Sequence, residues 1–90
     1  MTDRDQPTDS LAIALQQDLL QLYGPVIGQD DLRRALGYAS LGGFRQALAR
    51  GVLPVPVFAI PHRRGRYALT KDVAWWLAEL RRQASPPATA

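Results

Sequence analysis

The sequence predicts a mainly α-helical domain with one small β-hairpin. Four segments carry apolar residues three and four positions apart, which is the period of an amphipathic helix. Residues 52–61 hold three prolines, each of which removes a backbone donor, so this stretch is not expected to be helical. Directly after it, two short apolar runs flank the basic turn "HRRG" at 62–65. The predicted order is therefore helix, helix, turn, helix, hairpin, helix.

The first predicted helix covers residues 10–23. Ser10 or Asp9 caps it, and Gly24-Pro25 ends it. Its apolar stripe consists of leucines spaced by four, four and three residues: Leu11, Leu15, Leu19 and Leu22. Residues 1–9, which include Pro7, and residues 84–90 are predicted to be disordered tails. Residues 10–83 then form a single domain.

A pair of helices is predicted within residues 29–50. The first follows Gly28, carries Asp30 and Asp31 in its first turn and ends at Gly37. Ser40 is the expected N-cap of the second, which ends at Gly51.

The second helix of this pair is predicted to have two unlike faces. At about 100° per residue, one face is apolar, with Leu41, Phe44, Ala47 and Leu48. The opposite face is small and polar, with arginine at its margins. Gly42-Gly43 leaves two alternatives: either the backbone approaches a phosphate closely here, or the first turn is irregular and the helix starts nearer Phe44.

Residues 57–69, which we call the wing, are predicted to form two short strands, 57–60 and 66–69. They are joined by residues 62–65, in which Gly65 takes a left-handed conformation. Thr70 is expected to cap a last helix over residues 71–82. The predicted buried stripe of that helix is Val73, Trp76, Leu77 and Leu80.

The net charge of +3 is distributed unevenly. The first 30 residues hold five aspartates and one arginine, whereas the rest hold nine arginines and one lysine against three acidic residues. Because the guanidinium group suits phosphate and guanine, this excess favours a polyanionic partner. The alternative for each arginine is an ordinary solvated surface. The candidate DNA-binding residues are Ser40, Arg45, Gln46, Arg50, His62, Arg63, Arg64 and Arg66. Candidate phosphate contacts are Arg33, Arg34 and Lys71.

Two features leave a protein contact open. Trp75 lies about 100° from the predicted buried stripe, so it could cover the wing or bind another protein. The first helix is apolar over more than one face, which suits either half of a dimer interface or packing within the monomer.

Other classes of function lack their characteristic residues. There is no cysteine, one histidine and no glycine-rich phosphate loop, so we expect no enzyme, metal site, cofactor or small-molecule ligand. No apolar run reaches the roughly 18 residues of a membrane span, and the polar N-terminus does not resemble a signal peptide. A cytoplasmic location is expected, with no membrane partner.

The chain resembles the small excisionase-like, MerR-type winged-helix proteins, which include AlpA-type phage and prophage regulators. The resemblance spans residues 27–82 and rests on Leu36-Gly37, on Arg50-Gly51 before Leu53-Pro54, on the basic hairpin and on Trp76 in "DVAWWL". It implies a winged helix-turn-helix that binds DNA in phage or plasmid control. Gly42-Gly43 replaces the polar residues that begin this family's recognition helix, and the helix at 10–23 is additional.

Together these expectations describe a winged helix-turn-helix preceded by an extra helix. The predicted function is sequence-specific binding of double-stranded DNA, as a small transcription regulator or a recombination directionality factor. A homodimer or a cooperative array on DNA is a further expectation. The alternative function is a protein-interaction adaptor acting through the N-terminal helix and Trp75. A structural component of a phage-like particle is a third possibility, for which the sequence holds no positive sign.

Overall fold

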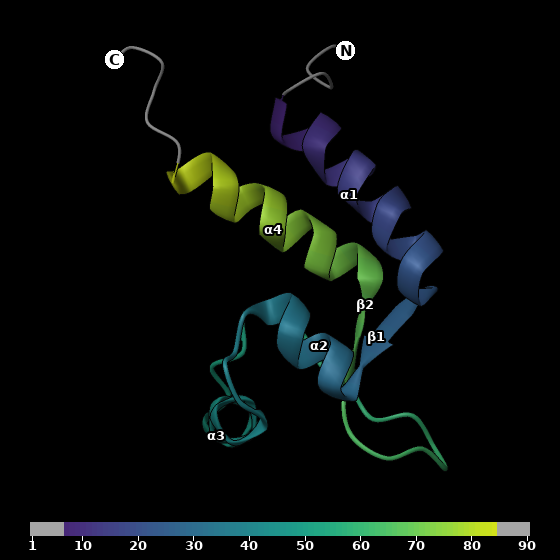
Figure 1. Cartoon of the computed structure of the whole chain (residues 1–90), viewed down its shortest axis with the longest axis vertical. Helices are drawn as coiled ribbons and strands as arrows, with labels where there is room; N and C mark the ends of the chain where they lie inside the picture. The colour runs from purple at the N-terminus through teal and green to yellow at the C-terminus, as the bar shows by residue number, and fades with distance from the viewer. Residues whose placement is uncertain (1–6, 85–90) are drawn as a thin grey trace.

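The computed structural model describes residues 7–84, which form an elongated body of 45 × 26 × 20 Å. Its elements are α1 Pro7–Tyr23, β1 Val26–Gly28, α2 Gln29–Leu36, α3 Leu41–Arg50, β2 Tyr67–Leu69 and α4 Thr70–Ala84. The fold is mainly helical with a small antiparallel sheet, as predicted. Figure 1 shows α1 and α4, which we call the helix pair, side by side at one end of the long axis. At the other end lie α3 and the wing, which we call the basic end.

The helix α1 begins three residues earlier than predicted. Its first residue is Pro7. Proline suits this position, because the first N–H of a helix has no acceptor within the helix and because the fixed φ of proline is close to the helical value. The prediction of a tail over residues 7–9 was therefore wrong, and α4 likewise continues to Ala84. The rest of the predicted tails, residues 1–6 and 85–90, lies outside the described residues.

Alanines that were not predicted to be buried are among the fully buried residues of the helix pair and form its seam. Ala12 of α1 and Ala74 and Ala78 of α4 are fully buried. The predicted stripes are confirmed in part, since Val73 is buried and Leu19 and Leu77 pack against the core. At their far ends they are wrong, since Leu22 is 69% exposed and Leu80 is 43% exposed. The alanines are buried for a steric reason, because small residues let two helix axes come close while longer side chains straddle the contact.

Thr70 joins the helix pair to the sheet. It is the first residue of α4, and its hydroxyl donates to the carbonyl of Gly24 at 2.5 Å. Its N–H donates to the carbonyl of Pro25 at 2.9 Å. The side chain was predicted to cap α4. The hydrogen bond that the structure shows instead holds α4 against the turn between α1 and β1.

The sheet differs from the predicted hairpin. The strand β2 pairs with β1, which was not predicted, with Ile27 opposite Ala68 and Gly28 opposite Tyr67. Of the predicted strand 57–60, only Phe58 pairs, in a single bridge to Tyr67 with N–O distances of 2.9 and 2.8 Å. Prolines on both sides of residues 57–60 remove the donors that a longer ladder needs. The wing is therefore a loop with one bridge, anchored by β2.

A single core connects α2, α3, the sheet and the start of α4. Its buried members are Ile27, Leu32, Leu36, Phe44, Val55, Ala68 and Val73. Trp76 packs against this cluster and is half-buried, which agrees with its predicted place on the inner face of α4. Across residues 7–84, no helix combines the length and the apolar character that crossing a bilayer requires.

Candidate nucleic-acid interface

The helix α3 has the two faces that the sequence predicted. Phe44 and Ala47 are buried, and the opposite face exposes Arg45, Gln46 and Arg50. Ser40 is the N-cap, since its Oγ accepts a hydrogen bond from the Gly43 N–H at 3.0 Å. The Ser40 hydroxyl hydrogen remains able to donate, because that bond uses only its oxygen.

The two glycines of α3 belong to a regular first turn. The helix begins at Leu41, so the alternative in which it starts nearer Phe44 was wrong. A Cβ on Gly42 would lie 3.9 Å from Ser40 Oγ, and one on Gly43 would lie 3.4 Å from it. Neither glycine is required by the packing of the free protein. A close approach of the backbone to a phosphate remains a prediction.

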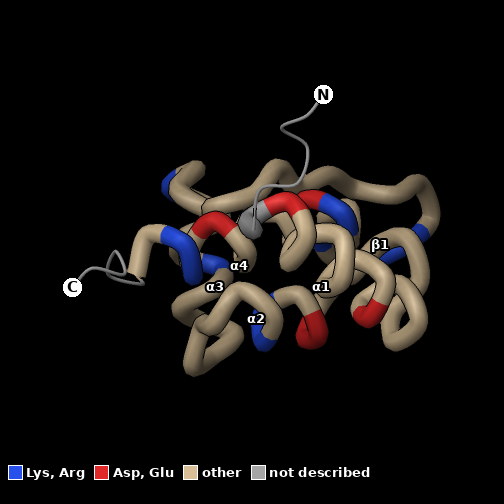
Figure 2. The backbone as a smooth tube through the Cα atoms, turned by 90° about the horizontal axis from the view of Figure 1, so that it is seen from above, with Lys and Arg blue, Asp and Glu red and all other residues tan. Residues whose placement is uncertain are grey.

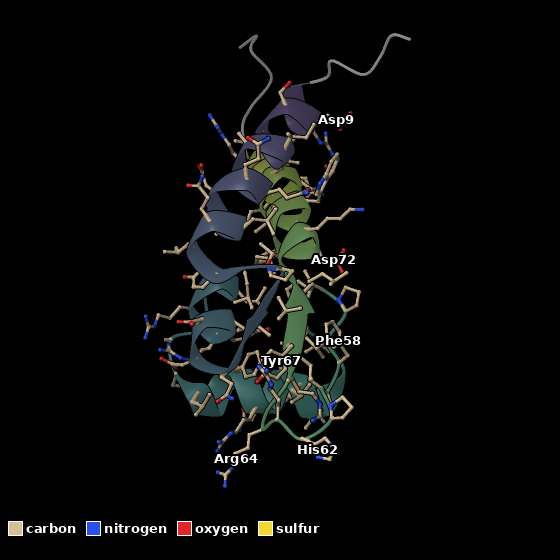
Figure 3. All side chains as sticks on the ribbon, turned by 90° about the vertical axis from the view of Figure 1, so that its right-hand side faces the viewer. Asp9, Phe58, His62, Arg64, Tyr67 and Asp72 are labelled. Atoms are coloured by element: carbon tan, nitrogen blue, oxygen red, sulfur yellow. The ribbon has the colours of Figure 1, made fainter. Side chains whose placement is uncertain are left out.

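The tip of the wing exposes its whole basic set: His62, Arg63, Arg64 and Arg66. The Arg63 N–H donates to the Ile60 carbonyl at 3.0 Å, which closes a turn with Pro61 and His62 at its centre. His62 has a φ of 67° in this turn, and Gly65 has the predicted left-handed conformation, with a φ of 82°. In Figure 3, His62 and Arg64 point away from the body at the end opposite Asp9.

An open cleft of about 400 Å³ separates α3 from the wing. Its lining residues are Gln29, Asp30, Leu41, Phe44, Arg45, Leu48, Gly65 and Arg66. Arg45 and Arg66 are 21 positions apart in the sequence, and the fold brings both onto this cleft. Three of the lining residues are apolar, namely Leu41, Phe44 and Leu48, and Asp30 is the acidic residue among those that line the cleft.

The negative charge of Asp30 is already bound by arginine. Arg33 Nε donates to its carboxylate at 2.6 Å and Arg34 donates at 2.9 Å. These hydrogen bonds, that of Arg33 first, lower the pKa of Asp30 from 3.8 to about 2. The carboxylate therefore stays ionised at neutral pH, but it is neutralised locally by its two partners.

The three candidate phosphate contacts occupy different surroundings. Arg33 also donates to the carbonyls of Tyr38 and Ala39, at 2.9 and 3.3 Å, so it fastens the turn between α2 and α3. Its side chain is only 18% exposed. The Arg34 side chain is 63% exposed and can still turn to solvent. Lys71 is exposed in the first turn of α4, separated from the wing tip by β2. The side chain of Arg33 is thus held by hydrogen bonds within the protein. Of the two arginines, Arg34 is therefore the better placed to contact a phosphate.

Sequence reasoning missed Gly28, Gln29 and the position of Tyr67. The Tyr67 ring lies over Gly28 so closely that a Cβ there would overlap it. Gln29 has a φ of 54° and contacts the wing through its backbone and its side chain. The local sequence holds no signal for these contacts except the glycine itself, because the partners are more than 30 residues apart.

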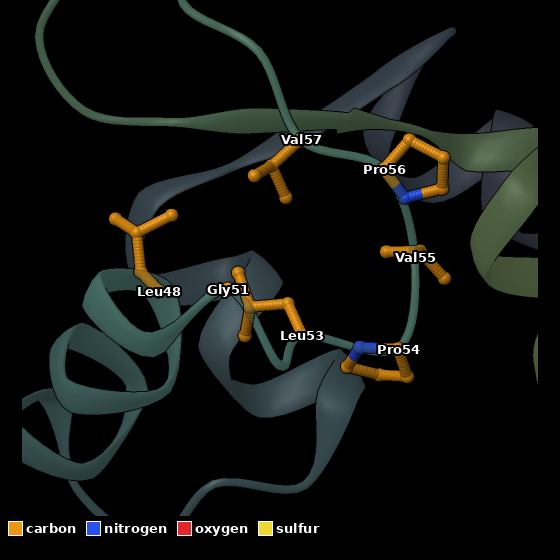
Figure 4. A pocket seen from close by; sticks show the side chains of 7 residues that line it. All are labelled: Leu48, Gly51, Leu53, Pro54, Val55, Pro56 and Val57. Atoms are coloured by element: carbon orange, nitrogen blue, oxygen red, sulfur yellow. The ribbon is translucent and has the colours of Figure 1, made fainter.

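A second hollow, of about 410 Å³, lies beside the end of α3. It is lined by Leu48, Gly51 and the segment 53–57. Figure 4 shows Leu48 and Val57 facing each other across it, with Pro54 and Pro56 on the far rim. No charged residue is among those that line it, in contrast to the cleft between α3 and the wing.

Other basic residues lie on opposite sides of the molecule. Figure 2, seen from above, shows the basic pair at the end of α4 on one side and basic residues of the wing loop on the other. Arg82 at that end of α4 pairs with Glu79. Within residues 7–84, no ion pair involves an arginine of α3 or of the wing.

The helix pair carries the other surface that the sequence singled out. Trp75 is 36% exposed, and its indole N–H donates to Gln16 Oε1 of α1 at 3.1 Å. It therefore ties α4 to α1 and does not cover the wing. Ile13 and Leu20 of α1 are 50% and 38% exposed, so an apolar strip remains on this end.

Comparisons with known proteins leave the resemblance to excisionase-like proteins untested. No family model matches the chain, and neither the curated proteins nor the solved structures contain a significant match. Among residues 7–84, no group of three His, Cys, Asp or Glu side chains could hold a metal ion. The assignment of function therefore depends on the geometry of the basic end.

Proposed function

We propose that this protein is a winged helix-turn-helix that binds double-stranded DNA sequence-specifically, as a small transcription regulator or a recombination directionality factor. In this proposal α3 enters the major groove, where Arg45 and Gln46 meet base edges and Arg50 anchors the helix. The wing lies along the flanking backbone or the adjacent minor groove, which attracts Arg63, Arg64 and Arg66.

One observation carries the proposal. Arg45 of α3 and Arg66 of the wing line the same cleft, so the two basic elements face a common space. Duplex DNA is the partner whose phosphates can meet both at once. The arginines of these elements need not break an ion pair within residues 7–84 before they bind phosphate. The α2–turn–α3 arrangement agrees with this assignment, since α3 appears nearly end-on in Figure 1 while α2 lies across the view.

Salt dependence tests the proposal directly. About five phosphate contacts should weaken binding by about 10²- to 10³-fold between about 50 and 200 mM salt. We would titrate a fluorescein-labelled duplex of mixed sequence and follow its anisotropy. The variant Arg63→Ala/Arg64→Ala should reduce the slope of log K against log salt by about 1.8, since each lost contact removes about 0.9.

The chain offers a matched control in Arg81→Ala/Arg82→Ala. This variant removes the same charge from an adjacent arginine pair on the last turn of α4, on the other side of the molecule. It should leave the slope nearly unchanged. Equal losses from both double variants would mean that net charge alone attracts the DNA, and would contradict a wing contact.

Sequence specificity is tested by selecting duplexes from a random library. Gln46→Ala should relax the preference at one base pair, because a carboxamide that bonds adenine is worth about 1–3 kcal/mol of discrimination. An unchanged consensus would contradict a role for Gln46 in base recognition.

A dimer or a cooperative array is part of the proposal, because a single small domain gains affinity when two copies occupy neighbouring sites. Sedimentation of the complex over a range of protein concentrations is the measurement. A strict monomer on DNA at every concentration would remove this part and leave DNA binding itself standing.

A protein-interaction adaptor is the second candidate, and the exposed strip of Ile13 and Leu20 favours it. Binding through such an apolar strip would change little between low and high salt. The hydrogen bond from Trp75 to Gln16 weakens this candidate, since it gives the indole a role within the monomer.

A further inference from the structure

Both non-glycine residues with positive φ in the described chain belong to the wing or contact it. They are Gln29, at 54°, and His62, at 67°. A left-handed conformation is unfavourable for residues with a Cβ, and it persists only where surrounding contacts impose it. Such residues gather at functional sites. The strain at Gln29 therefore calls for a physical explanation, which its contacts supply.

Gln29 holds three consecutive residues of the wing. Its backbone N–H donates to the Arg66 carbonyl at 3.3 Å, and its Nε2 donates to the Arg64 carbonyl at 2.9 Å. Between them lies Gly65, where a Cβ would be 3.1 Å from Gln29 Cγ. The Gln29 amide also lies 3.5 Å from the Tyr67 hydroxyl. Gln29 thus combines a left-handed backbone with a side chain that extends toward the wing.

Among the residues that the structure describes, Gln29 alone ties the wing tip to the body by hydrogen bonds. Within residues 7–84, the hydrogen bonds that join residues 61–66 to the fold outside the wing both begin at Gln29. The remaining bond of this loop, from Arg63 to Ile60, is internal to the wing. Gln29 therefore supplies the hydrogen bonds from the body that hold the backbone of Arg64 and Arg66.

We propose that Gln29 is a positioning residue for DNA binding, which holds the wing loop in its bound conformation before the duplex arrives. The inference rests on the proposed function, because it assigns the ordered loop a use. A loop that is ordered in advance loses less conformational entropy on association, so it binds more tightly than the same arginines on a mobile loop. Gln29 also lines the cleft with Arg45 and Arg66, which links the wing to α3.

Gln29→Asn is the variant that tests this proposal. Asparagine tolerates the left-handed conformation and keeps the backbone N–H, but its shorter amide does not reach the Arg64 carbonyl. We expect about tenfold weaker binding to a mixed-sequence duplex at low salt, because the loop must then be ordered on binding. The thermal midpoint should change little. Gln21→Asn, on the exposed side of α1, is the matched control and should alter neither quantity.

Gln29→Gly separates positioning from a general structural role. Glycine removes the backbone strain and the side-chain bond together, so the thermal midpoint should stay level or rise while DNA binding weakens. A merely structural residue would lower both.

The order of the wing is measured without DNA, through ¹⁵N relaxation. The backbone order parameters of residues 63–66 should be near 0.85 in the wild type and fall below about 0.6 in Gln29→Asn. Unchanged order parameters, or unchanged affinity in Gln29→Asn, would overturn the proposal. If the wild type does not bind the duplex, the proposed function fails. If Arg63→Ala/Arg64→Ala binds the duplex as the wild type does, the wing contact fails while DNA binding stands. In either case the role of Gln29 in binding falls. The relaxation data still decide whether Gln29 orders the loop.

Discussion

The helix pair and the basic end of this protein are stabilised by different contacts, although one small core connects them. In the helix pair, Ala12, Ala74 and Ala78 are fully buried, and apolar packing does most of the stabilising. At the basic end, the buried apolar side chains come from α3 and from Tyr67 and Ala68 of β2. Between α3 and β2, Val55 is the buried apolar residue, and the rest of that segment is held by turns and single hydrogen bonds. The elongated shape keeps these two regions apart.

This difference explains why the basic end is ordered without ion pairs from its arginines within residues 7–84. Backbone groups and neutral side chains such as Ser40 and Gln29 supply its order, so Arg45, Arg63 and Arg64 are not needed for ion pairs within residues 7–84. Arg33 shows the contrary arrangement, since its donors are used by Asp30 and two carbonyls. The comparison predicts that stability and DNA binding respond to different substitutions.

The largest effect is expected from Gly28→Ala, where the regions meet. The new Cβ would overlap the Tyr67 ring, so β1 and β2 must move apart. We expect a loss of about 3 kcal/mol in the free energy of unfolding, together with weaker DNA binding, because Tyr67 carries the wing bridge. Urea denaturation measures the first quantity and the duplex titration the second.

Gly42→Ala is the control for this change. Its Cβ meets nothing closer than 3.9 Å, and alanine is the better helix former, so stability should rise by roughly 0.5–1 kcal/mol. Weaker DNA binding by this more stable variant would support the close approach of a phosphate to Gly42. A stable Gly28→Ala protein would contradict the described packing of Tyr67.

Ala12→Leu should separate the effect on stability from the effect on DNA binding most clearly. The larger side chain overpacks the alanine seam, and we expect a loss of about 2 kcal/mol in stability with DNA affinity unchanged below the melting transition. Ala14→Leu is the matched control, because Ala14 is exposed on the same helix. A large loss of DNA affinity in Ala12→Leu would show that the helix pair takes part in binding. It would contradict the division between a stabilising helix pair and a DNA-binding basic end.

Ser40→Ala should cost about 1 kcal/mol, because the Gly43 N–H loses its cap. Thermal denaturation with a normal unfolding enthalpy would show a local loss at the start of α3. Ser10→Ala, at an exposed site within α1, should have no such cost. If both serine variants are equally stable, the cap contributes nothing and α3 is held by its apolar face alone.

The smallest effect concerns the pH dependence of Asp30. Because the folded state lowers its pKa to about 2, its pairing with Arg33 stabilises the fold above the ordinary pKa of 3.8 and is lost as the pH falls toward 2. The difference in thermal midpoint between wild type and Asp30→Asn should therefore shrink over this interval. Asp31→Asn, which removes no ion pair within residues 7–84, is the control. A constant difference down to pH 2 would contradict the pairing.

The sequence by itself determined the features that depend on neighbours along the chain. The Ser40 cap, the helix ends at Gly37 and Gly51 and the two faces of α3 were predicted and are confirmed. Their physical basis lies within one or two helical turns, so a short window of sequence contains it. The basic tip of the wing could be predicted for the same reason, because its charged residues are adjacent in the sequence.

Only the tertiary structure decided how these elements combine. The pairing of Ile27 with Ala68 joins two three-residue strands about 40 positions apart, too short for a periodic signal. Alanines form the seam of the helix pair because the closeness of two axes depends on both helices at once. The same holds for the cleft shared by Arg45 and Arg66 and for the hold of Gln29 on the wing. Each is a contact between distant residues, whose partners no local pattern can specify.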